Sequence, residues 1–450
     1  MKNGGKIMKQ KAKRLAIFVL SVILLMVSLT ACGEKQPEAA AEEASGEEKI
    51  TLRFFSALPD RTAGLGLLEE KMLEIYREEH PNVILETEYL QDEPYKVKLQ
   101  TYMQSGNMPD VWQQFGYGAL LEPVAKGNFA MELNPEDYGD YGFVPGALET
   151  YTVDGKLIGL PRNADYEVLY YNQKILEDYG IPVPQTTDDL IEAAEKLEGS
   201  GIYAVSLTGK DKWPIGDVLS ALVLRTTTDS GVLKKAVTTA TLSSTPEVTE
   251  GFNEFIRLVD NGVFQPSFAS DDYGTAKNLF VQGKTAMYMM GSWEIGMGND
   301  ESIPEEVREY IRAVPFPLIE GKAGTTEQLD LWFGGGYAAS ANSEHPKEAQ
   351  ELLEMLVKPE NYVRIGWEEQ LVIPPMNYDD YLTGEETQLQ IDLTEILNKA
   401  GEASGDNLCD YHTPEYKNES ETACLEFATK MISTEQFCER LDEAARAAIE

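Results

Sequence analysis

Cysteine and histidine, the residues most often used in metal sites and covalent catalysis, are scarce in this chain. Its 450 residues include four cysteines and three histidines. No CxxC pair occurs and the histidines lie far apart, so neither a zinc site nor a Cys/His catalytic pair is indicated. A disulfide framework needs more cysteines. Beyond Cys32, one bridge with one free thiol or three free thiols would account for Cys409, Cys424 and Cys438.

Cofactor motifs are missing as well. The sequence contains no P-loop, GxSxG or HExxH pattern. Gly64-Leu65-Gly66 follows an expected strand and opens an expected helix, but Glu69 occupies the third glycine position of the dinucleotide-binding pattern. An acid there would repel a pyrophosphate at the helix N-terminus. We therefore expect no cofactor and no metal.

Basic residues are few outside the N-terminal region. Six of the 38 Lys and Arg residues precede residue 15, so the chain after residue 31 has 32 basic residues against 76 acidic ones, a net charge of −44. Such a surface repels phosphate backbones, so we expect no nucleic-acid partner. It also disfavours anionic ligands and leaves a cationic ligand open.

Long apolar runs are absent after Leu29. Before it, six cations precede the uncharged run 15–29, and small residues follow, which is typical of a secretory signal. The alternative is a transmembrane helix, but a run of about 15 to 17 residues falls short of the roughly 20 needed. Leu29-Thr30-Ala31-Cys32 resembles the bacterial lipobox. This resemblance implies a signal peptide over 1–31, lipidation at Cys32, and anchoring on the extracytoplasmic face of the cell membrane. Residues 32–49 are polar and Ala/Glu-rich, and we expect a flexible tether.

The body of the chain alternates between strand and helix patterns. Strands are expected at 50–55, 81–86 and 110–113, with helices at 65–75 and 95–105 between them. This alternation predicts an α/β fold with a parallel sheet covered by helices on both faces. Asp154-Gly155 predicts a hairpin turn. Further elements are expected at 188–198 (with Thr187 as N-cap), 246–261, 273–282 and 285–290, and the chain from Gly384 onward reads as almost wholly helical.

Four stretches of the sequence together resemble one protein family. They are His80-Pro81-Asn82-Val83; Gly106-Asn107-Met108-Pro109-Asp110-Val111 with Gly118 to Pro123; Asp154 to Pro161 with Tyr170-Tyr171-Asn172, Gly180 to Pro184 and Thr187 to Leu190; and Phe280 to Met287 with Gly291-Ser292-Trp293. Their order over residues 50 to about 375 is similar to that of the extracellular solute-binding proteins of bacterial ABC importers, family 1, which includes maltose- and multiple-sugar-binding proteins.

The resemblance implies a two-lobed α/β fold of the periplasmic-binding-protein type, with discontinuous lobes joined by a hinge and a helical C-terminal part. By analogy, residues 50–164 and 315–374 form the first lobe, and residues 165–314 and 375–450 form the second. The crossings would then lie at 163–166, 314–317 and 373–376. A ligand would bind in the cleft between the lobes, which close over it.

Sugar sites combine aromatic faces with planar polar side chains, so tryptophans and polar residues at strand ends are the candidates. Tryptophan is usually buried in a core, and this alternative applies to each one. Trp293 resembles the family's ligand-stacking tryptophan, and Asp165 lies where the family often has a carboxylate in the cleft. Ligands gather at the carboxyl ends of parallel strands. The expected ligand-binding set is Ser56, Trp112, Gln113, Gln114, Phe115, Asp165, Tyr166, Trp213, Trp293, Trp332 and Gly335, with Trp367 and Tyr411 as weaker candidates.

Three classes of function fit the sequence. The resemblance implies a non-enzymatic, monomeric binding protein that captures a carbohydrate and delivers it to the membrane subunits of an ABC permease. One alternative is a secreted glycoside hydrolase, which needs two carboxylates roughly 5 to 9.5 Å apart. The other is a binder of a peptide, a polyamine or a metal on the same scaffold, because a fold does not determine its ligand.

Overall fold

The structure, a computed structural model, describes residues 49–400, 402–403 and 407–449. The predicted signal peptide, the lipidation site Cys32 and the tether apart from Lys49 lie outside these residues. Within the described ranges, no helix combines the length and the apolar character needed to cross a membrane.

The first lobe is built on a five-stranded sheet with the order β2-β1-β3-β13-β6. Its strands are β1 (Ile50–Ser56), β2 (Val83–Tyr89), β3 (Val111–Phe115), β6 (Leu160–Pro161) and β13 (Gly335–Ala339). As predicted, β1 runs parallel to β2 and to β3. The sheet is mixed rather than wholly parallel, because β13 pairs antiparallel with β3 and β6. Gly335 pairs with Phe115, the last residue of β3. The chain thus enters β13 at the end where β3 stops, which makes the two strands antiparallel.

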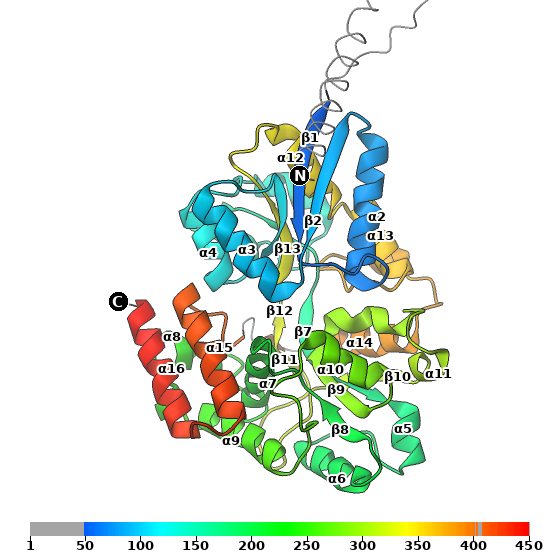
Figure 1. The fold of residues 1–450 in the computed structure, drawn as a ribbon, viewed down its shortest axis with the longest axis vertical. Coiled ribbons are helices and arrows are strands. Elements are labelled where there is room, and N and C mark those ends of the chain that lie inside the picture. The colour runs from blue at the N-terminus through cyan, green and yellow to red at the C-terminus, as the bar shows by residue number, and fades with distance from the viewer. Residues whose placement is uncertain (1–48, 401, 404–406, 450) are drawn as a thin grey trace, which may run out of the picture. The chain divides into compact units, whose positions relative to one another are not determined.

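Helices cover both faces of this sheet (Figure 1). They are α2 (Gly64–Glu79), α3 (Asp92–Ser105), α4 (Gly118–Lys126), α12 (Pro346–Met355) and α13 (Pro359–Glu368). In α2, Leu68, Met72 and Tyr76 recur every four residues and are fully buried. This spacing places them on one helix face, as the apolar pattern predicted.

The second lobe contains a four-stranded sheet with the order β10-β7-β9-β8, and β12 pairs with the start of β7. The strands are β7 (Asp165–Asn172), β8 (Tyr203–Ser206), β9 (Thr285–Gly291), β10 (Ile311–Pro315) and β12 (Leu331–Trp332). Every residue of β7 is buried. The helices are α5 (Gln173–Asp178), α6 (Thr187–Leu197), α7 (Trp213–Leu224), α8 (Val232–Thr238), α9 (Pro246–Asp260), α10 (Tyr273–Val281), α11 (Glu305–Arg308), α14 (Gln388–Asn398), α15 (Pro414–Ala428) and α16 (Thr434–Ile449).

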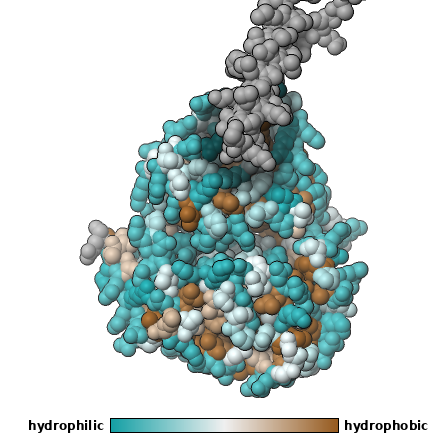
Figure 2. Space-filling model, viewed as in Figure 1, coloured by the Kyte–Doolittle hydropathy of each residue, from teal (hydrophilic) through white to brown (hydrophobic). Residues whose placement is uncertain are grey.

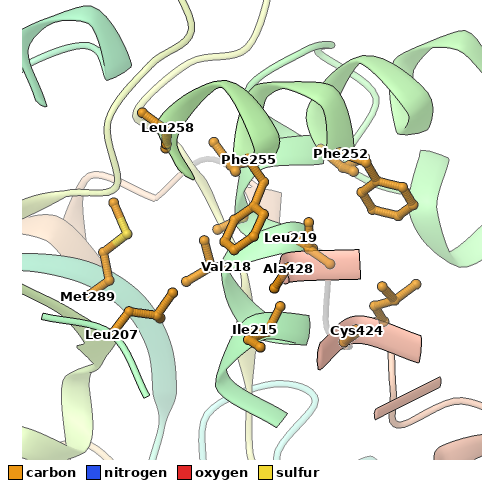
Figure 3. Packing of buried hydrophobic residues seen from close by; sticks show 14 of the residues in the cluster. Leu207, Ile215, Val218, Leu219, Phe252, Phe255, Leu258, Met289, Cys424 and Ala428 are labelled. Carbon is orange, nitrogen blue, oxygen red and sulfur yellow. The ribbon is translucent and has the colours of Figure 1, made fainter. Parts of the chain in front are cut away.

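Helix α7 is the centre of the second lobe's core. All of its residues after Trp213 are buried, and it packs against α9 and α15. Figure 3 shows Ile215, Val218 and Leu219 of α7 among side chains from these neighbours. Cys409, Cys424 and Cys438 belong to the same core and are free thiols, with the sulfur atoms of Cys409 and Cys424 3.7 Å apart.

Two local details concern turns and caps. The predicted hairpin joins β4 (Thr152–Val153) to β5 (Lys156–Leu157), and Asp154 and Gly155 take φ values of 50° and 78°. Positive φ at both turn positions is the geometry that favours an Asp-Gly pair. The expected N-cap of α6 is wrong by one residue. The hydroxyl of Thr186 accepts the amide hydrogen of Asp189, so Thr186 is the cap and Thr187 begins the helix.

The chain passes between the lobes three times. The first passage joins β6 to β7 through residues 162–164, within one or two residues of the analogy. The second lies later than expected, between β12 and β13. Residues 316–328 remain with the second lobe because the buried Arg225 donates to the carbonyl oxygens of Phe316, Thr325 and Gln328. This segment also carries β11 (Gln328–Leu329), which pairs with β14 (Glu402–Ala403).

The third passage is later than expected as well. The amide of Val144 donates to the Pro375 carbonyl, and the amide of Asn377 donates to the Gly142 carbonyl. Tyr378 and Tyr381 still pack against the first lobe's core. The chain then reaches α14, which packs against β10. We therefore propose that the first lobe comprises residues 50–162 and 335–381, and the second comprises residues 165–332, 388–400, 402–403 and 407–449.

The face of the molecule in Figure 2 is mostly hydrophilic, with hydrophobic residues in small, separate groups. This pattern fits the excess of acidic residues in the sequence.

Candidate functional site

A cavity of about 390 Å³ lies between the lobes. Its first-lobe wall comes from the segment after β1, the start of α2, the start of α3 and the end of β3. Its second-lobe wall comes from the starts of α7 and α10, from the 3-10 helix η4 (Ser292–Gly298) and from residues before and within α15. The volume falls within the range of small-molecule sites.

Aromatic side chains form one wall of the cavity. The ring centroid of Trp293 lies 5.8 Å from those of Trp213 and Trp332. All three indoles are only partly buried. The indole N–H of Trp293 donates to the Tyr273 hydroxyl at 3.1 Å, which in turn donates to Glu294. The rings are therefore fixed by hydrogen bonds and by one another, and leave apolar surface facing the cavity.

Strand β3 contributes Gln113 and Phe115 to the opposite wall. The side-chain oxygen of Gln113 accepts the Ala57 amide at 3.0 Å and the Ser56 hydroxyl at 3.4 Å. Ser56 lies behind Gln113, fully buried, and donates to Glu69 at 2.9 Å. Ser56 thus orients a residue of the wall without lining the cavity itself.

The passage from β6 to β7 supplies a buried polar group made of Arg162, Asn163 and Asp165. The Asn163 amide donates to the Asp165 carboxylate, and the Arg162 guanidinium donates to the Asn163 side-chain oxygen at 3.3 Å. Burial raises the pKa of Asp165 to about 7, although Arg162 and Asn163 oppose the shift. Gly335 lies against this group, since a Cβ atom there would be 2.4 Å from the Asn163 oxygen.

A first group of charged residues comes from α3, α15 and the loop before α15. The ammonium group of Lys96 is 3.1 Å from Asp92, and that of Lys417 is 2.6 Å from Asp410. Burial alone would lower the pKa values of both lysines, but the neighbouring carboxylates raise them. The indole N–H of Trp213 donates to Asp92 at 2.7 Å, which links the second lobe to the first.

A second charged group lies beside η4. The Lys277 ammonium is 2.7 Å from Glu294, with Asp60 and Asp300 close enough to affect its pKa. Burial would lower that pKa, and the three carboxylates raise it. Close by, a Cβ atom on Gly296 would lie 3.0 Å from the Cα atom of Gly64 in α2, so the backbones of the two lobes nearly touch here.

Seven of the predicted site residues line the cavity, and four do not. Those that line it are Gln113, Phe115, Asp165, Trp213, Trp293, Trp332 and Gly335. Ser56, Trp112, Gln114 and Tyr166 lie in the interior instead. Successive side chains of a strand point to opposite faces, which separates Trp112 and Gln114 from their lining neighbours in β3, and Tyr166 from Asp165 in β7. The weaker candidates, Trp367 and Tyr411, are also buried away from the cavity.

Several cavity residues were not singled out from the sequence. They are chiefly charged or tyrosine side chains: Asp92, Lys96, Tyr117, Arg162, Asp217, Tyr273, Lys277, Glu294, Asp410 and Lys417. One of them, Asp217, could have been identified from the sequence. Asp217 is a lone acid in the apolar helix α7, four residues after Trp213 and therefore on the same helix face.

The arrangement is suited to non-covalent binding of a polar ligand with apolar faces. Aromatic rings can cover C–H surface, while amides, carboxylates and cations take hydroxyl groups. In the part of the chain that the structure describes, no group of three or more His, Cys, Asp or Glu residues could hold a metal ion.

Comparisons with known proteins agree with this fold. Residues 60–363 match the family profile "Bacterial extracellular solute-binding protein". An ABC transporter extracellular-binding protein of Pyrococcus horikoshii is 27% identical over 329 residues, which cover 71% of each chain. The multiple sugar-binding protein of Streptococcus mutans is 22% identical over 340 residues, covering 74% of this chain and 76% of the relative.

Among solved structures, a chitin oligosaccharide binding protein superimposes with a TM-score of 0.77 at 23% identity, covering 89% of this chain and 99% of the other. The likeness confirms the predicted two-lobed fold. The family match spans well over half of the sequence and confirms the resemblance carried by the four sequence stretches. The chain belongs to the family of bacterial extracellular solute-binding proteins.

Proposed function

We propose that this protein captures a carbohydrate outside the cytoplasm and delivers it to the membrane subunits of an ABC importer. The observation that supports this function best is the cavity wall formed by Trp213, Trp293 and Trp332, opposite the planar polar group of Gln113. Indole faces suit the C–H face of a pyranose, and planar amides suit its paired hydroxyls. The name of the Streptococcus mutans relative, a multiple sugar-binding protein, is in keeping with this ligand class.

The test is direct binding combined with analysis of the ligand. The chain from Lys49 onward, a compact unit by itself, would be screened against mono- and oligosaccharides by thermal shift, since a ligand that binds only the native state raises the melting temperature. A sugar that binds should be recovered unchanged. If new reducing ends form at a rate that scales with protein concentration, the protein is a hydrolase. If polyamines or peptides shift the melting temperature and no sugar does, the carbohydrate proposal is wrong.

We also propose that the protein is held at the membrane by a lipid on Cys32, after removal of residues 1–31. The basic N-terminal stretch, the apolar run and the lipobox-like sequence support this anchor. Cys32→Ser should leave an uncleaved precursor or release soluble protein, and the lipid label should be lost. A variant that remains lipid-labelled would contradict the proposal.

A further inference from the structure

Asp217 is the only acid of the cavity wall whose two carboxyl oxygens both lack a hydrogen-bond partner among the described residues. It lies on α7, one turn after Trp213, and is 1% exposed. Other buried acids of the cavity are partnered: Asp165 by Asn163, Glu294 by Tyr273 and Lys277, and Asp410 by Lys417. A buried carboxyl group without a partner is costly, so Asp217 is poised to accept a donor that the protein itself does not supply.

The charges near Asp217 are predominantly negative. Besides burial, the groups that raise its pKa are the carboxyl groups of Glu167, Asp410 and Asp330 and the thiol of Cys409. Two cations of the cavity wall are already engaged. Lys96 is paired with Asp92 and Glu93, and Lys417 with Asp410 and Glu421. These two lysines are therefore paired with four carboxylates, and Asp217 is a fifth acidic group nearby. Positive charge is thus deficient in this part of the cavity.

A bound metal does not fill this deficit, because the described residues contain no group of three or more ligating side chains able to hold one. A neutral hydroxyl would satisfy one oxygen of Asp217 but would leave the charge imbalance unchanged. An ammonium group would do both, since it carries three donors and a positive charge. The observations therefore favour a cationic donor over a neutral one.

We propose that the cleft selects a carbohydrate bearing a protonated amino group, and that the carboxyl group of Asp217 takes that group. The inference rests on the proposed carbohydrate function and names the class of sugar. The neighbouring Trp213 would cover the ring face of the same sugar unit, because it lies one helical turn away on the same face of α7.

Binding of such a sugar has a signature that neutral sugars lack. Burial, followed by the charges of Glu167 and Asp410, raises the pKa of Asp217 well above its usual value, so at pH values below that raised pKa the carboxyl group holds a proton while the cleft is empty. An ammonium ion beside it favours the ionised form. Binding of the amino sugar should therefore release protons to the buffer, whereas a neutral sugar should release none through this group.

The experiment compares three oligosaccharides of equal length and β-1,4 linkage, made of glucosamine, N-acetylglucosamine or glucose. Binding to the chain from Lys49 onward is measured by calorimetry in buffers of different ionisation enthalpy. The glucosamine oligomer should bind about tenfold or more tightly than either neutral oligomer, because a hydrogen bond to a charged group adds about that much. It should also be the one that releases protons.

Asp217→Asn keeps the shape of the side chain and removes its charge. The variant should bring the three affinities to within about threefold of one another and abolish proton release. Its melting temperature should not fall, because an uncompensated buried acid has been removed. Glu301→Gln, the corresponding acid-to-amide change at an exposed site that does not line the cavity, should retain the wild-type preference.

Two results would overturn the inference while leaving the carbohydrate function intact. One is equal or tighter binding of a neutral oligomer by the wild-type protein. The other is an undiminished glucosamine preference in Asp217→Asn. A different failure, in which no member of a wider panel of neutral and amino sugars binds, would refute the carbohydrate function itself.

Discussion

Replacing Trp293 by alanine should weaken ligand binding far more than it weakens the fold. The indole is partly exposed at the cavity wall, with its N–H bonded to Tyr273 and its ring against Trp213 and Trp332. Loss of a stacking face and of the apolar area it covers should cost roughly 1 to 3 kcal/mol of binding free energy. That corresponds to an affinity about tenfold to hundredfold lower.

Trp112 provides the matched control, because it is the same residue type placed wholly in the first lobe's core. It is fully buried, and its indole N–H donates to Gln114 at 2.8 Å. Trp112→Ala should lower the free energy of unfolding by roughly 3 to 5 kcal/mol. Trp293→Ala should lower it by less, because part of its ring is already in contact with water.

The assay pairs calorimetric affinity with denaturant unfolding for both variants. The expected pattern is a large affinity loss with a small stability loss for Trp293, and a large stability loss for Trp112. Affinity should be measured well below the unfolding transition, so that the folded fraction is the same in each sample. Unchanged affinity together with a large stability loss for Trp293→Ala would show that the indole serves the core and does not contact ligand.

Three further results are expected. In the native protein Asp165 keeps its proton up to about pH 7, whereas in the unfolded chain it loses the proton near the ordinary pKa of 3.8, so the free energy of unfolding should fall as the pH rises from about 4 to 7. In Asp165→Asn the melting temperature should fall less over the same pH range. An equal fall in both proteins would contradict this explanation. Glu69→Ala should lower the free energy of unfolding, measured in urea, by about 3 kcal/mol, because Arg61 loses its buried partner and the Tyr337 hydroxyl loses its acceptor. A decrease below about 1 kcal/mol would mean that water replaces these interactions. Gly296→Ala places a Cβ atom 3.0 Å from Gly64, so the lobes should close less completely, and small-angle scattering of the ligand-saturated variant should give a larger radius of gyration than the wild type.

The strands β1, β2 and β3 and the helices α2 and α3 could be predicted because each has a local pattern. The run Ile50–Phe55 and the spacing of Leu65, Leu68, Met72 and Ile75 in α2 each identify their element without reference to the rest of the chain. The direction of β13 could not be predicted in this way. It is set by where the chain returns from the second lobe, about 170 residues after β6, and no local pattern records that return.

The aromatic part of the site was more predictable than its charged part. Trp293 and Trp332 lie close to glycines, and Trp293 is also in a segment that resembles the family, which distinguishes them from core tryptophans. Trp112 was predicted to bind ligand together with its neighbours in β3, but successive side chains of a strand point to opposite faces, and Trp112 points into the core. The lysines of the cavity come from α3, α10 and α15, and nothing in their local sequence distinguishes them from solvated surface charges. Only the tertiary packing brings them together.

The position of β13 between β3 and β6 has a consequence for how the protein is made. In the first lobe's sheet, β13 lies between β3 and β6 and ends at Ala339, 178 residues after Pro161. Both neighbouring strands are therefore synthesised well before β13. At roughly 5–20 residues per second, synthesis takes about 10 to 35 s to supply it. During that interval both neighbouring strands have open backbone edges, which are templates for mispairing with another chain. The second lobe's strands up to β12 are complete before this sheet can close, so we expect the N-terminal sheet to become resistant to proteolysis only after Ala339 has been made.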